Sequence, residues 1–234
     1  TKKSGERVKQ MGEALQNIHI VGSPNFDLFN GMDLSLNFDP CKKYMGVGKE
    51  FPIVPNNYIV VLQHPVTSEY KSSFSNIQET LKAISEINIP TIWLWPNMDA
   101  GSDASSSAIR DFREKYKHLP IHFFKNFSFE DYARLINNCE VLVGNSSSGI
   151  REASFLGTPV VNIGSRQNNR ERGRNVVDVP YHDKTKIVDA INKQLKKGRY
   201  EADYIYGKGN SGEIIAKKLV DFKVQIQKEF IHRG

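Results

Sequence analysis

The stretch VLVGNSSSGIREASFLGTPVVNIGSR, residues 141–166, has the clearest alternation of structural signals in the chain. Apolar Val141–Val143 is typical of a buried strand, and Gly144–Gly149 is typical of a polar turn. Ile150–Leu156 then predicts a helix, and Pro159–Ile163 predicts a second strand. A strand that leads through a turn into a helix and on to another strand is the repeating unit of parallel α/β sheets. The pattern therefore predicts an α/β fold.

The turn in this stretch has the features of an anion site. Backbone N–H groups at the start of a helix, together with the positive end of the helix dipole, favour an anion and most often a phosphate. Ser146, Ser147 and Ser148 add hydroxyl donors, and Arg166 adds a planar guanidinium fork. Glu152 would lie in the first turn of the helix, as an N-terminal charge or as an acceptor for ribose hydroxyls. A solvated, Ser-rich loop that only caps the helix is the alternative.

The same alternation runs through most of the chain. Short, wholly apolar strands that alternate with helices predict a parallel sheet with helices on both faces. Further strands are expected over 58–62, 91–95 and 121–124, with helices over 71–87, 104–116, 128–137, 183–196 and 211–228. Ahead of these we expect a helix over 5–14, a strand over 18–21 and an irregular stretch with a short helix over 25–54. The prediction is a Rossmann-like, doubly wound parallel sheet in one domain, residues 1–234.

Polar side chains follow the predicted strands. Right-handed crossovers bring the carboxyl ends of parallel strands to one edge of the sheet, where open α/β sheets bind ligands. This edge would receive Ser23, His64, Asn97 with Asp99, Asn126, the serine turn and Arg166. Together these groups predict a nucleotide or sugar-phosphate site. A dinucleotide or Walker-type triphosphate site is not expected, because the chain has no GxGxxG or GKS/T sequence.

Composition narrows the class of protein. The chain has 234 residues and a net charge of +6, which suits an anionic ligand without requiring nucleic acid. Cys41 and Cys139 lie far apart and favour reduced thiols in the cytoplasm, and no cluster of His, Cys and carboxylates has the spacing of a metal site. No apolar run approaches the roughly 20 residues of a membrane span, and no secretory signal is present. Because the chain begins with Thr1, we expect a piece of a longer protein.

Five motifs resemble the UDP-N-acetylglucosamine 2-epimerase family over nearly the whole chain. They are RVKQMGE (7–13), IVGSPNFD (20–27), LQHPVT (62–67), PNMDAGS (96–102) and GNSSSGIREASFLGTPVVNIGSRQNNRERGRNV (144–176). The last block is long and highly specific. HPVT after its strand resembles the hydrolysing branch, which releases N-acetylmannosamine for sialic acid synthesis, whereas the non-hydrolysing branch typically has an Arg-Arg-Glu-Asn run after its His.

The resemblance implies an architecture and a division of labour. Family members have the two-domain glycosyltransferase-B fold, and this chain is similar to the C-terminal, UDP-binding half. The N-terminal half carries the acidic residues that move protons at the sugar C2, and nothing in this chain matches it. The resemblance therefore implies an isolated chain that binds UDP but is inactive. It also implies a homodimer or homotetramer at full length, with no cofactor and neither nucleic acid nor membrane as partner.

The resemblance and the strand ends together assign roles to residues. His64 is the catalytic candidate, because an imidazole with an ordinary pKa near 6.5 can donate a proton or a charged hydrogen bond to the leaving phosphate. For UDP we expect Ser146, Ser147, Gly149, Arg166 and, for the base, Asn126. By resemblance Glu152 should hold the ribose hydroxyls. The sugar or the domain cleft is expected to face Asn97, Asp99, Ser102 and Ser23.

Other readings of the sequence stay open. A glycosyltransferase half would keep the fold, although the HPVT and NSSSGIRE blocks argue against it. Within the epimerase family, the sugar could also be a bacterial diacetamido-dideoxy hexose. The alternative outside the enzymes is a domain that binds a nucleotide or nucleic acid without catalysis. Nucleic-acid binding would weaken steeply with salt and show no preference for uridine.

Overall fold

The computed structural model describes residues 1–222 and 227–232. The chain divides into two compact units, one over Asp33–Asp203 and one that combines Thr1–Met32 with Tyr204–Gly234. We call them the sheet unit and the terminal unit. The sheet unit contains every predicted site residue except Ser23. The organisation of residues 1–234 as one domain stays a prediction.

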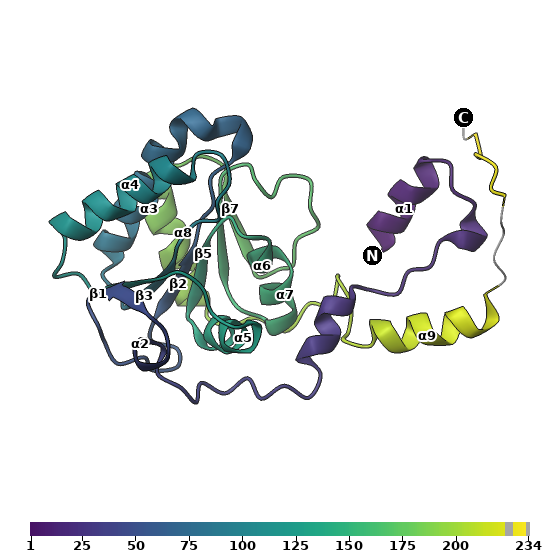
Figure 1. Ribbon diagram of the computed structural model, residues 1–234, viewed down its shortest axis with the longest axis horizontal. Helices are drawn as coiled ribbons and strands as arrows, with labels where there is room; N and C mark the ends of the chain where they lie inside the picture. The colour runs from purple at the N-terminus through teal and green to yellow at the C-terminus, as the bar shows by residue number, and fades with distance from the viewer. Residues whose placement is uncertain (223–226, 233–234) are drawn as a thin grey trace. The chain divides into compact units, whose positions relative to one another are not determined.

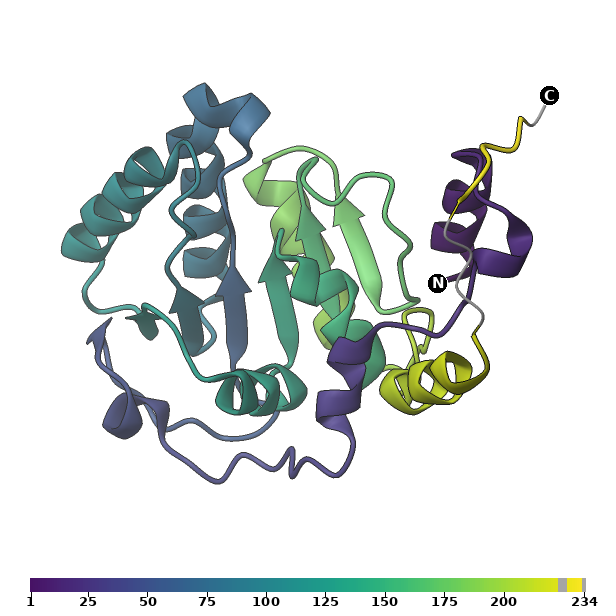
Figure 2. The same ribbon diagram turned by 45° about the vertical axis from the view of Figure 1, so that its right-hand side comes forward.

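A seven-stranded sheet forms the centre of the sheet unit (Figure 1). Its order is β1-β4-β3-β2-β5-β6-β7, and every neighbouring pair is parallel except β1 with β4. The arrowheads of the central strands therefore point the same way in Figure 2. The strands are β1 (Gly46–Gly48), β2 (Ile59–Leu62), β3 (Thr91–Leu94), β4 (Ile121–Phe124), β5 (Val141–Gly144), β6 (Val160–Ile163) and β7 (Val176–Val179).

The winding of the sheet reverses between β2 and β5. From β2 the chain proceeds outward to β3 and β4, and it then returns to place β5 on the other side of β2. Loops leave such a pair of strands in opposite directions, so a crevice opens beyond their carboxyl ends. The doubly wound α/β fold predicted from the sequence is confirmed.

Helices cover both faces of the sheet and close two hydrophobic cores. One core packs against α3 (Ser73–Ile87), α4 (Ser102–Lys115) and α8 (Lys184–Lys197). The other packs against α5 (Phe129–Asn138) and α7 (Glu152–Leu156), with α6 (Ser147–Ile150) on the same face in Figure 1. Ile59 and Val61 belong to the first core, whereas Tyr58 and Val60 belong to the second. Strand side chains alternate between faces, so strands buried on both sides must be apolar at every position.

Most predicted elements are found within a few residues of their expected ends. Ser128 caps α5, since its side chain accepts a hydrogen bond from the Asp131 N–H. The expected helix over 71–87 begins at Ser73, after the short 3₁₀ helix η3 (Thr67–Ser72). Two strands, β1 and β7, and the one-turn helix α2 (Pro40–Lys43) were not predicted individually.

One predicted strand, over 18–21, is wrong. This segment follows the 3₁₀ helix η1 (Leu15–Asn17), pairs with no strand of the sheet and leaves Ile20 52% exposed. Its apolar residues therefore do not reflect burial between two layers. As a consequence Ser23 follows no sheet strand; its N–H instead donates to the carbonyl of Tyr206 at 2.7 Å within the terminal unit.

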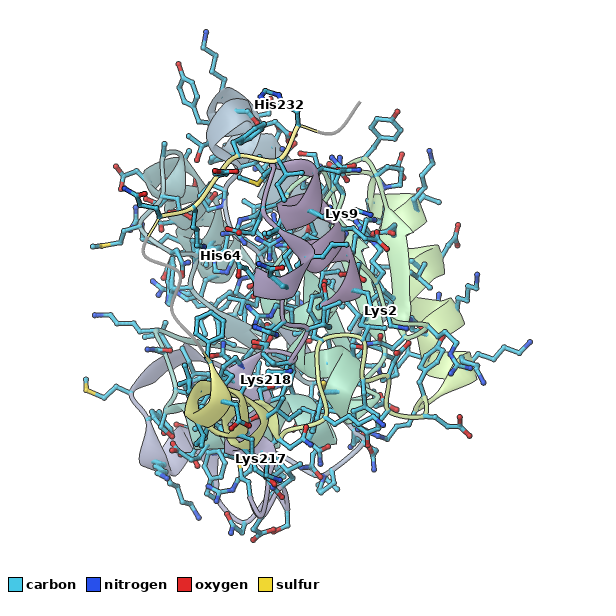
Figure 3. The ribbon with its side chains drawn as sticks, turned by 90° about the vertical axis from the view of Figure 1, so that its right-hand side faces the viewer. Lys2, Lys9, His64, Lys217, Lys218 and His232 are labelled. Carbon is cyan, nitrogen blue, oxygen red and sulfur yellow. The ribbon has the colours of Figure 1, made fainter. Side chains whose placement is uncertain are left out.

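The terminal unit combines α1 (Lys2–Gln10) and η2 (Pro24–Phe29) with α9 (Ser211–Asp221). The Asp27 carboxylate accepts hydrogen bonds from the N–H groups of Ser211 and Gly212, at 2.8 and 2.6 Å, and so satisfies the start of α9. Figure 3 labels lysines on α1 and α9, of which Lys217 pairs with Glu213. The predicted helix over 211–228 ends at Asp221, and residues 223–226 of it lie outside the described residues.

Candidate functional site

A cavity of about 380 Å³ opens at the carboxyl ends of five neighbouring strands. It extends across the point where the winding reverses, because β2 and β5 both contribute to it. Its lining consists of Leu62, His64, Leu94, Trp95, Pro96, Asn97, Lys125, Asn126, Ser146, Ser147 and Arg166. Side chains from five strand ends thus face one space with two cationic groups, which is the arrangement that an anion requires.

The loop after β2 is attached to the loop after β5 by one side chain. The Oδ1 atom of Asn145 accepts a hydrogen bond from the His64 N–H at 2.7 Å, and its Nδ2 donates to the His64 carbonyl at 2.8 Å. Both residues are buried, with 1% of Asn145 and 6% of His64 exposed. Two bonds to one residue fix its main chain in position and in rotation, so the imidazole leaves the β2 loop at a defined place.

The imidazole of His64 is neutral near pH 7. The Asn97 N–H donates to its Nδ1 at 3.1 Å, so the proton of the neutral ring lies on Nε2. Burial lowers the pKa of His64 to about 4; the nearby Arg166 adds to this effect, and Asp99 opposes it. The expectation of an ordinary pKa is therefore wrong for the free protein. His64 therefore offers a neutral N–H donor from Nε2.

This pKa predicts how stability depends on pH. The folded-state pKa of about 4 lies below the ordinary value near 6.5, so the unfolded chain binds the proton more tightly. The contribution of neutral His64 to stability is complete above pH 6.5 and is lost as the pH falls toward 4, by about 3 kcal/mol. Urea unfolding of the chain and of His64→Gln from pH 7.5 to 4 measures it. Equal losses in both proteins would contradict the prediction.

Arg166 is held in place before any ligand arrives. Its Nη1 donates to the Asn145 carbonyl at 3.3 Å, and its Nη2 lies 3.9 Å from Asp99 Oδ2. Gln167, which is 1% exposed, donates from Nε2 to the same Asn145 carbonyl at 2.8 Å. The guanidinium thus faces the cavity with part of its hydrogen-bonding capacity still open to an anion.

The serine turn begins a pair of short helices instead of the single predicted one. Ser146 is the N-cap of α6 and accepts hydrogen bonds from Ser148, at 3.3 Å from its N–H and 3.0 Å from its hydroxyl. The buried Ser148 hydroxyl also lies 2.6 Å from the Tyr132 hydroxyl, so it belongs to the packing of α5. Ser146 and Ser147, in contrast, line the cavity.

Glu152 begins α7, after a kink at Arg151. Burial raises the pKa of its carboxyl. Glu152 does not belong to the described residues that line the cavity. A role in holding ribose stays a prediction.

The structure brings six of the predicted site residues together in one cavity, and five others, Asp99, Gly149, Glu152, Ser102 and Ser23, are outside its lining. His64, Asn97, Asn126, Ser146, Ser147 and Arg166 line the one cavity. Asp99 lies next to it, through Arg166. Gly149 packs against Val160 of β6, and Ser102 begins α4, where its N–H donates to the Asp99 carbonyl at 2.9 Å. Ser23 belongs to the terminal unit.

Sequence reasoning did not select Lys125, Asn145 or Gln167. Lys125 directly follows β4 and lines the cavity, so its position at a strand end was a usable signal. Asn145 lies within the polar turn predicted over Gly144–Gly149, directly after β5. Its hydrogen bonds to His64 join residues 81 positions apart, and no local pattern carries that information.

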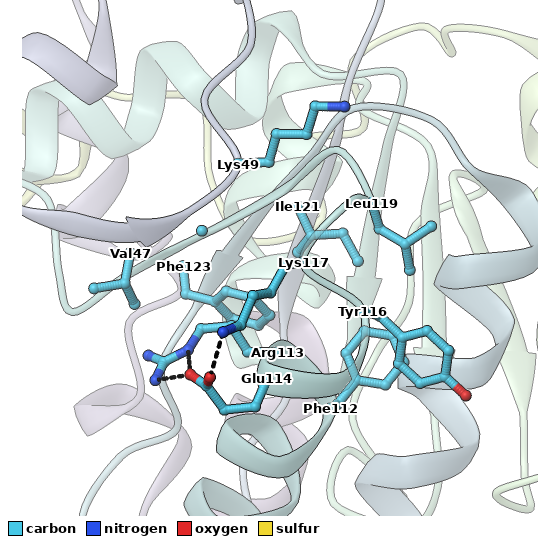
Figure 4. A pocket seen from close by; sticks show the side chains of 11 residues that line it. Val47, Lys49, Phe112, Arg113, Glu114, Tyr116, Lys117, Leu119, Ile121 and Phe123 are labelled. Atoms are coloured by element: carbon cyan, nitrogen blue, oxygen red, sulfur yellow. Dashed lines mark hydrogen bonds and ion pairs between the residues drawn. The ribbon is translucent and has the colours of Figure 1, made fainter.

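A second cavity of similar size differs in chemistry (Figure 4). It lies beside β1 and the end of α4, and its walls include Phe112, Tyr116 and Phe123. Its cationic groups already have partners. Arg113 and Lys117 both pair with Glu114, and Lys49 donates to the His118 carbonyl. The cavity at the strand ends is therefore the candidate functional site.

The described residues contain neither a metal-binding cluster nor a helix that could span a membrane. Within residues 1–222 and 227–232, the side chains of His, Cys, Asp and Glu form no group of three or more that could hold a metal ion. Over the same ranges, every helix is too short or too polar to cross a bilayer.

The strand order and the position of the cavity define a doubly wound α/β protein of the glycosyltransferase-B kind, with a ligand site where the winding reverses. The family profile of UDP-N-acetylglucosamine 2-epimerase matches residues 1–220. The chain belongs to this family, as its motifs suggested.

Named relatives agree with this assignment. The chain is 32% identical over 231 residues to UDP-N-acetylglucosamine 2-epimerase of Neisseria meningitidis serogroup B. The aligned residues cover 96% of this chain and 58% of that protein. It is 31% identical over 221 residues to the hydrolysing UDP-N,N'-diacetylbacillosamine 2-epimerase of Legionella pneumophila, with 91% and 54% covered. The chain therefore spans little more than half the length of these relatives.

A solved structure supports the fold. UDP-GlcNAc 2-epimerase of Methanocaldococcus jannaschii, in complex with UDP-GlcNAc and UDP, superposes with a TM-score of 0.70 at 18% identity, over 95% of this chain and 60% of that one.

Proposed function

We propose that this chain is the UDP-binding half of a hydrolysing UDP-N-acetylglucosamine 2-epimerase. The full enzyme would convert UDP-N-acetylglucosamine to N-acetylmannosamine and UDP, for sialic acid-type sugar synthesis in the cytoplasm. The observation that carries the proposal is the convergence of His64, the serine turn and Arg166 on one cavity, although the first and the last are about a hundred residues apart.

The proposed reaction divides into two chemical tasks. In the first, the C2–H and C1–O bonds of the sugar break, a C1=C2 double bond forms, and UDP leaves with the electron pair of the C1–O bond. In the second, water adds to this glycal: its hydroxyl joins C1 and a proton joins C2 from the opposite face. A group that stabilises the departing diphosphate lowers the barrier of the first task, because negative charge grows on the phosphate oxygens.

The residues at the cavity suit the leaving diphosphate. Arg166 would neutralise its growing charge with a planar fork, and Ser146 and Ser147 would donate hydroxyl hydrogen bonds. The Nε2–H of His64 would donate to the phosphate oxygen that leaves C1. Lys125 adds a second cationic group on the β4 side. The uracil would lie near Asn126, and Glu152 would accept the ribose hydroxyls.

Proton transfer at C2 would come from acidic residues outside this chain. Asp99 instead lies beside Arg166, with its Oδ2 3.9 Å from the guanidinium Nη2. We therefore propose that the isolated chain binds UDP without turning over the UDP-sugar. The full-length enzyme would work as a homodimer or homotetramer without a cofactor.

Calorimetric titration with nucleotides tests the proposal. The purified chain is expected to bind UDP saturably, at one site and more tightly than CDP or ADP. It should release no UDP from UDP-N-acetylglucosamine. A flat UDP titration of the folded chain would refute the proposal, and equal affinity for single-stranded nucleic acid with a steep salt dependence would favour the nucleic-acid alternative.

A diacetamido sugar is the second candidate substrate. The relative from Legionella pneumophila is named as a UDP-N,N'-diacetylbacillosamine 2-epimerase. Both candidates share the UDP leaving group, so the cavity suits either. Turnover by the full-length enzyme of UDP-N-acetylglucosamine, compared with the UDP-diacetamido sugar, separates them.

A further inference from the structure

Asn145 joins three loops of the candidate site. It follows β5, and its N–H donates to the Leu62 carbonyl at 3.2 Å, just past the last paired residues of β2 and β5. There the main-chain ladder ends and the Asn145 side chain replaces it. The amide donates to and accepts from the main chain of His64, as the next residue of a paired strand would. The His64 turn is thereby tied to β5.

The carbonyl of Asn145 fixes the loop after β6. It accepts hydrogen bonds from Arg166 Nη1 at 3.3 Å and from Gln167 Nε2 at 2.8 Å. Its N–H, its carbonyl and both ends of its amide are therefore all engaged with protein groups. Asn145 is 1% exposed, and its polar groups are hydrogen-bonded to protein groups. It therefore positions other side chains of the site and does not contact a ligand directly.

We infer that Asn145 is the positioning residue of this site: it sets the imidazole of His64 and the guanidinium of Arg166 at one spacing before a ligand binds. The inference rests on the proposed function, since it identifies the ligand as a diphosphate held between these two groups. A preformed pair of donors avoids the ordering cost of binding, whereas loose donors would have to be arranged by the ligand itself.

The test compares Asn145→Ala with a matched control, Asn175→Ala. Asn175 is also buried, and its Nδ2 donates to the Thr158 carbonyl at 2.7 Å, but it lies between β6 and β7 and outside the cavity. Both substitutions remove a buried amide that donates a hydrogen bond to a main-chain carbonyl, so both should lower thermal stability. Only the Asn145 variant is expected to change the titration of His64. NMR of the ring nitrogens measures this titration. Arg166 and Asp99 are unaltered in both variants and remain beside the ring.

In the ligand-free chain the His64 pKa is expected to rise from about 4 toward 6.5 in Asn145→Ala and to stay unchanged in Asn175→Ala. UDP affinity should fall at least tenfold in the first variant and less than twofold in the second. An unaltered His64 titration in Asn145→Ala would overturn the inference. Absence of UDP binding by the unaltered chain would instead refute the proposed function, because the titration needs no nucleotide.

A second variant and a measurement on the unaltered chain cover the case in which Asn145→Ala does not fold. Asn145→Ser leaves a smaller void and is expected to move the His64 titration in the same direction. In the unaltered chain the His64 N–H, bonded to Asn145 Oδ1, should exchange slowly with deuterium, and more slowly with UDP bound. Exchange at the rate of an exposed loop amide would overturn the inference.

Discussion

Arg166→Ala is expected to weaken UDP binding by about a hundredfold. The guanidinium lines the cavity and is held toward it by the Asn145 carbonyl and Asp99, so it meets an anion without rearrangement. A hydrogen bond to a charged group contributes about 1.5–3 kcal/mol, and two of them from one fork give an effect of this size after the ordering costs. Calorimetry at a fixed, moderate ionic strength measures the change.

Two further variants separate the effect of the planar fork from the effect of the positive charge. Arg166→Lys keeps the charge and loses the planar fork, so we expect an intermediate loss of about tenfold. Arg174→Ala removes the same charge from an exposed position outside the cavity, and its affinity should stay within twofold. If Arg174→Ala weakened binding as much as Arg166→Ala, net charge and not the fork would explain the affinity.

Gly144→Ala is expected to destabilise the folded chain by about 4–5 kcal/mol. Gly144 ends β5 at φ +132°, a conformation that residues with a Cβ rarely adopt, and a Cβ there would lie 2.1 Å from the Leu62 carbonyl oxygen. The strained backbone costs about 1–3 kcal/mol, and forcing β2 and β5 apart adds a comparable amount. The free energy of unfolding in urea measures the sum, which corresponds to a decrease in Tm of roughly 10 °C.

Gly198→Ala is the control for the backbone term. Gly198 has φ +69° and ψ −161° after α8, and a Cβ there would meet nothing within 4 Å. Only the conformational cost applies, so a loss of about 2 kcal/mol is expected. Similar losses in both variants would mean that the close approach of Gly144 to Leu62 does not matter for stability.

The sequence predicted the elements whose signal is local. Apolar runs such as Tyr58–Leu62 marked strands buried on both faces. The unpredicted strands lack this signal. β1 has glycine at two of its three positions, and β7 contains Asp178 and follows a charged loop. Residues 18–21 show the opposite case. Their short apolar run predicts a strand, but the segment pairs with no strand of the sheet.

The sequence by itself determined which polar groups follow the strands, because that order depends only on where each strand ends. Tertiary structure decided which of these groups meet. The strand order places β5 beside β2, and so Asn145 beside His64, through contacts across 81 positions that no local pattern encodes. Tertiary structure also decided the charge state of His64. The same imidazole would titrate near 6.5 in water, and its burial beside Arg166 lowers that value to about 4, because a low-dielectric surrounding and a neighbouring cation both disfavour the charged ring.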